Sequence, residues 1–189
     1  MRPIALIGMP GGGKSTVGRH LARRLDCEFV DTDALIERHI GRSIRNFFEQ
    51  EGEERFRDVE AAVLADVIVD TSVVIATGGG IVLRDENRAR LHQQTTCIYL
   101  LSTPEELYRR LRHDSKRPLL QVADPLARLR ELFLKRDPLY RQAAHFVIET
   151  GRPSVPTLVN MILMQLELAG VLDPAQVPAF IDSARPPAQ

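Results

Sequence analysis

The sequence predicts an α/β fold, in which a parallel β-sheet carries helices on both faces. Five short apolar segments alternate along the 189 residues with segments of helical periodicity. Strands that are connected through helices run parallel and are covered on both sides, so each is expected to be a continuous apolar run. The second observation is a glycine-rich segment at residues 8–15, placed directly between the first strand and the first helix. Ligands of such folds bind at the carboxyl ends of the strands.

The expected elements follow one another in regular order. The strands are expected at 4–8, 28–31, 73–77, 96–100 and 145–148, and the helices at 13–25, 34–40, 43–70, 84–92, 104–111, 125–141 and 153–168. Two helices have clear start signals, because Thr103 and Asp124 each place a capping side chain before a proline at the first helical position. Gly52 interrupts the long segment 43–70, so we expect it to divide into two helices that form a hairpin standing off the sheet.

Composition limits the possible functions. A chain of 189 residues fits one domain with its own hydrophobic core. Lys plus Arg and Asp plus Glu number 25 each, so the formal net charge is zero and no basic surface for nucleic acid is expected. Cys27 and Cys97 are interpreted as core residues, and the five histidines lack the spacing of zinc ligands. No apolar run reaches the roughly 18 residues of a membrane span, and no signal peptide precedes the first strand, so we expect a cytoplasmic protein without a membrane partner.

Residues 8–15, here called the phosphate loop, read GMPGGGKS and match the pattern G-x-x-x-x-G-K-[ST]. Glycines allow backbone N–H groups to turn inward around a polyphosphate, and the following helix adds its positive N-terminal end. Lys14 can reach the β- and γ-phosphates, and the Ser15 hydroxyl can ligate Mg²⁺. A glycine-rich turn without a ligand would need neither side chain, so the pattern predicts a nucleoside triphosphate site.

Two carboxylates follow the second strand, in the sequence Asp31-Thr32-Asp33. Residues two apart on an extended chain do not share one direction, so the two groups can serve different purposes, one near Mg²⁺ and the other near a substrate hydroxyl. The alternative is that Asp33 only caps the following helix, which is a common role for aspartate. The residues alone leave this choice open.

The third strand ends in three glycines at 78–80, here called the glycine run. Without side chains, this segment allows a ligand to lie against the backbone and bind its N–H groups, although a tight turn is the simpler explanation.

Three arginines, Arg57, Arg117 and Arg136, are each typical of solvated surface positions when taken alone. The segment 113–123 lacks periodicity and is either a surface loop or a mobile lid that excludes water during a phosphoryl transfer.

In combination, these features resemble the shikimate kinase family from the first strand to about residue 168. The shared motifs are GMPGGGKST at 8–16, DTD at 31–33, Arg57-x-x-Glu60, VIATGGG at 74–80, RPL at 117–119 and KRDPLY at 135–140. The resemblance implies a three-layer P-loop NTPase fold of the nucleoside-monophosphate-kinase type, with a five-stranded parallel sheet and a lid at about 113–123. It also implies a kinase domain at 1–170 with a substrate-binding helical region at about 33–62, followed by a tail at 171–189 that we expect on the surface or without order. The likeness weakens at 152–154, where the family closes its adenine pocket.

The resemblance further implies the roles of individual residues. Shikimate would be held by Asp33, Arg57, Gly79, Gly80 and Arg136, and Mg²⁺ by Ser15 and Asp31. The nucleotide would be contacted by Gly11, Gly12, Gly13, Lys14, Ser15, Thr16, Arg110 and Arg117, with Arg110 against the adenine. The catalytic groups would be Asp33, Lys14 and Arg117.

The chemistry of these residue types agrees with the resemblance. Arg57 and Arg136 can bind a carboxylate through their planar guanidinium forks. Asp33 can accept hydrogen bonds from ring hydroxyls and help to remove the proton as the 3-hydroxyl of shikimate attacks the γ-phosphate. We therefore expect a monomeric, Mg²⁺-dependent enzyme that converts ATP and shikimate into ADP and shikimate 3-phosphate, a step toward chorismate and the aromatic amino acids. A gluconate or nucleotide kinase, and a module that binds ATP without turnover, are the alternatives.

Overall fold

A parallel sheet of five strands forms the centre of the protein. The computed structural model describes residues 2–69, 71–112, 122–173 and 175. The strands are β1 (Ile4–Ile7), β2 (Glu28–Asp31), β3 (Val73–Ala76), β4 (Thr96–Leu101) and β5 (Phe146–Glu149). Their order in the sheet is β2-β3-β1-β4-β5, and every neighbouring pair is parallel. The expected sheet is confirmed, with strand ends that differ from the prediction by at most one residue.

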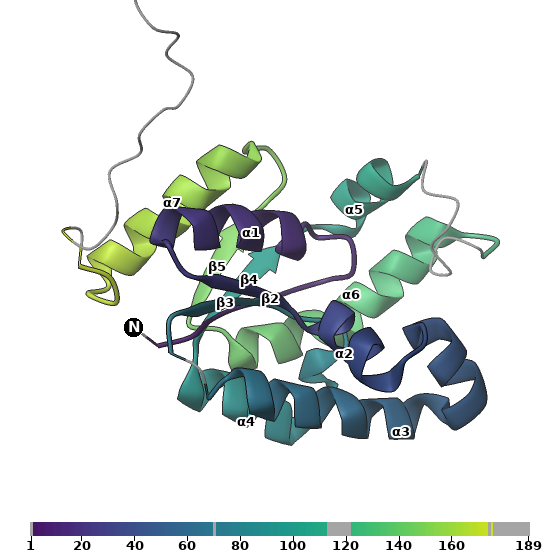
Figure 1. Cartoon of the computed structure of the whole chain (residues 1–189). Helices are drawn as coiled ribbons and strands as arrows, with labels where there is room; N and C mark the ends of the chain where they lie inside the picture. The colour runs from purple at the N-terminus through teal and green to yellow at the C-terminus, as the bar shows by residue number, and fades with distance from the viewer. Residues whose placement is uncertain (1, 70, 113–121, 174, 176–189) are drawn as a thin grey trace, which may run out of the picture.

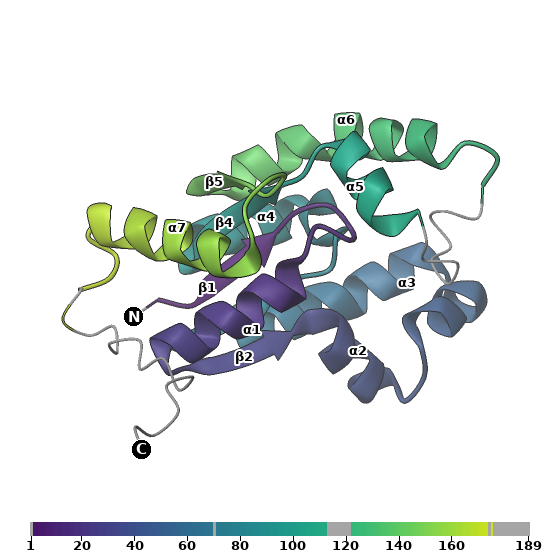
Figure 2. The same cartoon turned by 90° about the horizontal axis from the view of Figure 1, so that it is seen from above.

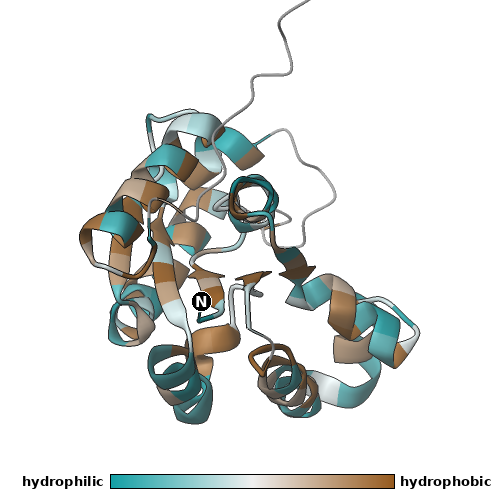
Figure 3. Cartoon of the chain, turned by 60° about the vertical axis from the view of Figure 1, so that its left-hand side comes forward, coloured by the Kyte–Doolittle hydropathy of each residue, from teal (hydrophilic) through white to brown (hydrophobic). Residues whose placement is uncertain are grey.

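Helices cover both faces of the sheet. The helices are α1 (Lys14–Leu25), α2 (Thr32–Ile40), α3 (Ile44–Val67), α4 (Asp85–Gln94), α5 (Pro104–Leu111), α6 (Pro125–Ala143) and α7 (Val155–Leu168), with a short 3₁₀ helix at Ile81–Leu83. One face is covered by α1 and α7 and the other by α3, α4 and α6 (Figure 1). The helices turn apolar residues inward and polar residues outward (Figure 3). The three-layer prediction is therefore confirmed.

The central strand β1 explains why the strands are continuously apolar in the sequence. Ile4 and Leu6 pack into the apolar cluster beneath α1 and α7, whereas Ala5 and Ile7 pack into the cluster on the opposite face. All four residues are fully buried. Because neither side of the sheet meets water at β1, no polar residue is tolerated at alternate positions. Cys97 is likewise buried and Cys27 is partly buried against the cluster beneath α1, as expected for core residues.

Gly52 divides α3 into two helical segments. Its backbone has φ 84° and ψ 171°, which lies outside the helical region and in a region that is essentially restricted to glycine. The chain changes direction there, so that α2 and the first part of α3 stand away from the sheet (Figure 2). Phe48 packs against Phe56 across the break, with ring centroids 4.6 Å apart. The predicted division of segment 43–70 is confirmed, but the expected hairpin standing off the sheet is wrong for the second half, since Val63, Leu64 and Val67 pack into the core.

The two predicted helix starts are present. Thr103 accepts a hydrogen bond from the N–H of Glu106 at 3.3 Å, and the Glu106 carboxylate accepts one from the N–H of Thr103 at 2.9 Å, which together form a capping box. Asp124 accepts a hydrogen bond from the N–H of Ala127 at 2.9 Å. Each cap is followed by a proline at the start of the helix. In the part of the chain that the structure describes, no helix has the length and apolar character needed to cross a bilayer.

The folded region continues past residue 170. Gly170 adopts a positive φ of 68°, and the N–H groups of Val171 and Leu172 both donate to the carbonyl of Leu166. Leu172 is buried in the cluster beneath α1 and α7. The expectation of a tail on the surface is therefore wrong for Leu172, because the turn at Gly170 leads the chain back onto the core. Most of the predicted tail, 174 and 176–189, lies outside the described residues.

We expect Gly52→Ala to lower the free energy of unfolding by about 1–3 kcal/mol, measured by urea denaturation, because a Cβ makes this backbone conformation unfavourable. Among the described residues, no heavy atom beyond the neighbouring backbone lies within 4 Å of the added Cβ, so the loss would come from the backbone conformation and not from a clash. Gly41→Ala is the control, since Gly41 is also unobstructed but has the ordinary left-handed conformation of a helix C-cap. For Gly41→Ala we expect the free energy of unfolding to fall by about 1 kcal/mol. Equal stability of Gly52→Ala and the parent protein would contradict the proposed role of Gly52.

Candidate functional site

The phosphate loop leaves β1 and leads directly into α1. Gly8 has φ 146°, and a Cβ at this position would lie 2.6 Å from the carbonyl oxygen of Leu100. Gly13 has φ 86° and takes the N-cap position of α1 without any capping side chain. The backbone N–H groups of the first turn of α1 therefore have no side-chain cap and are available to an anion. This is the geometry that the sequence pattern predicts.

A polar pocket of about 390 Å³ lies over this loop. Its lining includes Lys14, Ser15 and Asp33, together with residues of the loop and of the glycine run. Lys14 is almost fully buried, and its Nζ donates to the carbonyl oxygens of Gly8 and Met9, each at 2.9 Å. These bonds hold the ammonium group against the inner side of the loop. The pocket thus combines an anion-binding backbone with a fixed positive charge.

Asp31, and not Asp33, caps α2. One oxygen of the Asp31 carboxylate accepts hydrogen bonds from the N–H groups of Asp33, at 3.1 Å, and Ala34, at 3.3 Å. The other oxygen accepts a hydrogen bond from the Ser15 hydroxyl at 2.5 Å. The alternative in which Asp33 only caps the helix is therefore wrong, because Asp31 already takes that role. The side chain of Asp33 instead lines the pocket.

Ser15 and Asp31 form a pair of oxygen donors beside the loop. Mg²⁺ that is bound together with phosphates commonly takes one or two protein oxygens, and phosphate and water oxygens complete its octahedron. The hydroxyl and the carboxylate are hard ligands of the kind that this cation prefers. Since both residues line the pocket, the donor set fits the predicted cation.

The pKa of Asp33 is raised above its usual value. The main cause is that surrounding protein atoms desolvate the carboxyl group, although the residue is exposed at the open pocket, and the second is the negative charge of Asp31. Lys14 lowers the pKa, Glu37 raises it and Arg57 lowers it, but the net direction is upward. The carboxylate is thus a stronger proton acceptor than an ordinary aspartate, while it stays accessible from the pocket.

The glycine run allows several side chains to converge. An added Cβ would lie 2.6 Å from Oδ1 of Asp33 at Gly78 and 2.7 Å from the ring of Pro10 at Gly79. At Gly80 it would overlap the guanidinium group of Arg57. The sequence suggested that these glycines leave room for a ligand. The structure adds that they leave room for the protein's own charged side chains and for the phosphate loop.

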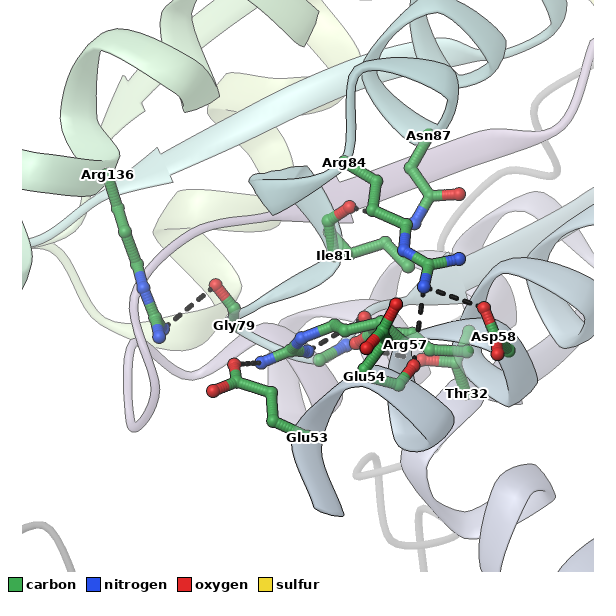
Figure 4. A network of polar contacts seen from close by, with 12 residues as sticks. Thr32, Glu53, Glu54, Arg57, Asp58, Gly79, Ile81, Arg84, Asn87 and Arg136 are labelled. Atoms are coloured by element: carbon green, nitrogen blue, oxygen red, sulfur yellow. Dashed lines mark hydrogen bonds and ion pairs between the residues drawn. The ribbon is translucent and has the colours of Figure 1, made fainter. Parts of the chain in front are cut away.

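Arg57 is held in place by a carboxylate on each side. Its Nη1 donates to Glu60 at 2.8 Å and its Nη2 to Glu53 at 3.0 Å (Figure 4). The guanidinium also lies over the rings of Phe56 and Phe48, at 5.2 Å and 5.8 Å from their centroids. These contacts aim Arg57 at the glycine run, as the residues in Figure 4 show.

Glu60, to which sequence reasoning gave no role, is a buried partner of Arg57. It is 2% exposed, and burial raises its pKa while the charge and hydrogen bond of Arg57 lower it. A carboxylate buried this deeply requires a cationic partner, which Arg57 provides across one helical turn. The motif Arg57-x-x-Glu60 was visible in the sequence, and its i,i+3 spacing on a helix is the signal that could have identified the pair.

Arg136 reaches the glycine run from α6. Its Nη1 donates to the carbonyl oxygen of Gly79 at 3.2 Å (Figure 4). Arg57 and Arg136, which are 79 positions apart in the sequence, therefore both lie at the same three glycines. Two guanidinium groups at one short backbone segment form a site for an anionic group that has two or more oxygens.

A second cavity of about 330 Å³ lies on the other side of the phosphate loop. Arg110 lines it and donates to Ser102 at 3.3 Å and to the carbonyl of Thr150. The wall opposite includes Pro153 and Ser154, in the region where the sequence gave no confident assignment. The structure thus brings Arg110 together with the loop at 151–155. The family resemblance places the closure of its adenine pocket at 152–154, and Pro153 and Ser154 line this cavity.

The predicted lid cannot be placed. Arg117 and the rest of 113–121 lie outside the described residues, and only Val122 and Ala123 at the end of the segment are described, both exposed. The roles of Arg117 and of the lid therefore stay predictions.

Comparisons with known proteins agree with this geometry. The family model described as shikimate kinase matches residues 10–167. The shikimate kinase of Paracidovorax citrulli is 57% identical over 176 residues, which cover 91% of this chain and 96% of the relative. That of Ralstonia nicotianae is 54% identical over 171 residues, covering 90% of each chain. The structure of shikimate kinase from Acinetobacter baumannii in complex with shikimate is 44% identical and superposes with a TM-score of 0.85, covering 92% of this chain and 96% of that chain.

We expect Asp33→Asn to raise the free energy of unfolding at neutral pH. Because the native pKa of Asp33 is raised, the native state keeps its proton to a higher pH than the unfolded chain does. The cost of ionising Asp33 therefore appears as the pH rises through the native pKa, and it disappears below the pKa of the unfolded chain. Urea denaturation from acid to neutral pH should show a gain for Asp33→Asn that shrinks as the pH falls.

Asp66→Asn is the matched control, because Asp66 is also exposed but lies on α3 and does not line the pocket. A gain of the same size in this variant, or a loss of stability in Asp33→Asn at neutral pH, would contradict the claim that ionised Asp33 destabilises the native state.

Proposed function

The chain belongs to the shikimate kinase family, and from this premise we propose how its residues transfer the γ-phosphate of ATP to shikimate. One observation carries the proposal. A single pocket joins Lys14 and Ser15 of the phosphate loop to Asp33, and it borders the glycine run where Arg57 and Arg136 meet. A donor site for a triphosphate and an acceptor site for a hydroxy acid therefore share one wall.

ATP binds with its phosphates in the phosphate loop. The uncapped first turn of α1 offers its N–H groups, and the ammonium group of Lys14 provides positive charge near the γ-phosphate. Ser15 and Asp31 hold Mg²⁺, which when bound neutralises charge on the phosphate oxygens. Gly11, Gly12, Gly13 and Thr16 complete the phosphate contacts, since all four line one or both of the cavities beside the loop.

Shikimate binds on the opposite side of the pocket. Its carboxylate takes hydrogen bonds from the guanidinium groups of Arg57 and Arg136, and its ring lies against the backbone of Gly79 and Gly80. Glu53 and Glu60 also help this binding. Their two carboxylates restrict the movement of Arg57, so that the N–H groups they do not bind stay oriented toward shikimate.

Asp33 accepts the proton of the attacking hydroxyl. As the 3-hydroxyl oxygen forms a bond to the γ-phosphorus and the bond to the β-phosphate bridging oxygen breaks, the proton passes to the Asp33 carboxylate. The raised pKa of Asp33 favours this transfer. Because the phosphoryl group is largely dissociated at the transition state, the alignment of the two substrates and the charge of Lys14 contribute more than complete deprotonation.

The remaining assignments belong to the same proposal. Arg110 lies against the adenine in the cavity beside 151–155, and Arg117 adds charge at the phosphates when a lid at 113–123 closes. We also propose that the enzyme is a monomer in the cytoplasm, that its ligands are small molecules, and that neither nucleic acid nor a membrane takes part.

The alternatives differ in the acceptor. Gluconate has a carboxylate and hydroxyls but no ring to lie on the glycine run. A nucleoside monophosphate offers a phosphate in place of the carboxylate, and a binding module would retain ATP without turnover. Paired guanidinium groups beside bare backbone match a flat hydroxy acid best, because a wrong ligand leaves buried polar groups without partners.

The test is ADP release by the purified protein with Mg²⁺ and ATP, in the presence of shikimate, gluconate or a nucleoside monophosphate. We expect turnover with shikimate that exceeds turnover with each of the others by about 10⁴-fold in kcat/KM. Faster turnover of gluconate or of the nucleotide would overturn the assignment. ATP binding without turnover of any acceptor would favour the binding module.

A further inference from the structure

One turn of α6 contacts two different parts of the sheet. Arg136 and Tyr140, four residues apart, both reach the carbonyl oxygen of Gly79. Asp137 and Arg141, also four residues apart, both lie beside Tyr99 of β4. Residues with this spacing share one face of a helix, so α6 presents one pair to the glycine run and the next pair to the strand.

The hydroxyl of Tyr140 makes the shorter of the two hydrogen bonds to the glycine run. It donates to the carbonyl oxygen of Gly79 at 2.6 Å, whereas Nη1 of Arg136 lies at 3.2 Å. Tyr140 is fully buried, and burial raises its pKa to about 12, so the hydroxyl keeps its proton and stays a donor at neutral pH. The short bond therefore persists under the conditions in which the enzyme works.

Tyr99 packs its ring against α6 from the centre of the sheet. Its ring lies 4.9 Å from that of Tyr140, and its hydroxyl donates to Asp137 at 3.0 Å. Arg141 donates to the second oxygen of Asp137 at 2.9 Å. Tyr99 pairs with Ile7, the last residue of β1 before the phosphate loop. The packing of the two rings, which Tyr99→Phe keeps, thus connects α6 to the strand next to β1.

We propose that Tyr140 is a positioning residue for the acceptor, acting through Gly79 and Arg136. This inference rests on the proposed acceptor site. The carbonyl of Gly79 has two lone pairs and accepts one bond from each side chain. The Tyr140 bond fixes the orientation of the peptide unit that joins Gly79 to Gly80, and Arg136 is thereby set at the edge of the acceptor site. Without the Tyr140 hydroxyl, the carbonyl retains Arg136 as its donor, and this bond competes with the acceptor carboxylate for the guanidinium group.

A purely structural role for Tyr140 predicts something different. If only ring packing mattered, loss of the hydroxyl would change stability and leave the affinity for the acceptor unaltered. Tyr99 offers a matched comparison, since it is also a fully buried tyrosine whose hydroxyl has one protein acceptor, but that acceptor is Asp137 and not the glycine run. Both substitutions to phenylalanine remove one oxygen and keep the ring.

The test compares Tyr140→Phe with Tyr99→Phe in steady-state kinetics. For Tyr140→Phe we expect the KM for shikimate to rise by about fivefold to tenfold, as for the loss of one buried hydrogen bond, with kcat and the KM for ATP changed by less than about twofold. For Tyr99→Phe the KM for shikimate should stay within about twofold. An unchanged KM in Tyr140→Phe, or equal increases in both variants, would overturn the proposal.

A double-mutant cycle with Arg136→Lys tests the route of the effect. If Tyr140 acts through Gly79 and Arg136, the increase in KM caused by Tyr140→Phe should be smaller in the Arg136→Lys background, because the two changes affect one set of contacts. Fully additive effects would contradict this route. Assays of the parent protein separate the proposed function from the role of Tyr140. If the proposed function is wrong, the parent protein itself does not turn over shikimate, whatever the variants do.

Discussion

The close contact between the glycine run and the phosphate loop is the constraint on which the rest of the site depends. At Gly79 an added Cβ would lie 2.7 Å from the ring of Pro10, so the two backbone segments approach as nearly as glycine allows. Because β3 and β1 are parallel neighbours, the segments that follow them leave the sheet side by side. The phosphate loop and the glycine run therefore form one packed unit, and under the proposed function this packing sets the distance between the two substrates.

Charge is concentrated at this unit in a protein whose net charge is zero. Asp33 and Glu60 both have raised pKa values, chiefly because of burial, and each lies near Gly78. Arg57 stabilises Glu60 through a 2.8 Å bond and in return is held at Gly80. Such an arrangement lowers stability where the carboxylates are ionised, and under the proposed function it forms the proton acceptor and the carboxylate clamp before any ligand arrives.

Sequence reasoning succeeded where the chemistry is local. Apolar runs gave the strands, Gly52 gave the break in α3, and the phosphate loop follows from its pattern. It failed where a role depends on contacts between distant residues. The residue types leave open whether Asp33 only caps α2, and only the bonds from the N–H groups of Asp33 and Ala34 show that Asp31 is the cap. Tyr140 ends the motif KRDPLY, but the motif gives it no role because its partner lies on another element, and Leu172 is buried only through the turn at Gly170.

The most direct test of the packed unit is kcat for shikimate phosphorylation in Gly79→Ala, with binding of ATP and of shikimate measured separately by calorimetry. The added methyl group must displace Pro10 or the glycine run, since a contact of 2.7 Å is not sustained. A displacement of about 1 Å between donor and acceptor should lower kcat by about 100-fold, while each substrate still binds alone. A kcat within about threefold of the parent, in a variant that folds and binds both substrates, would contradict the account.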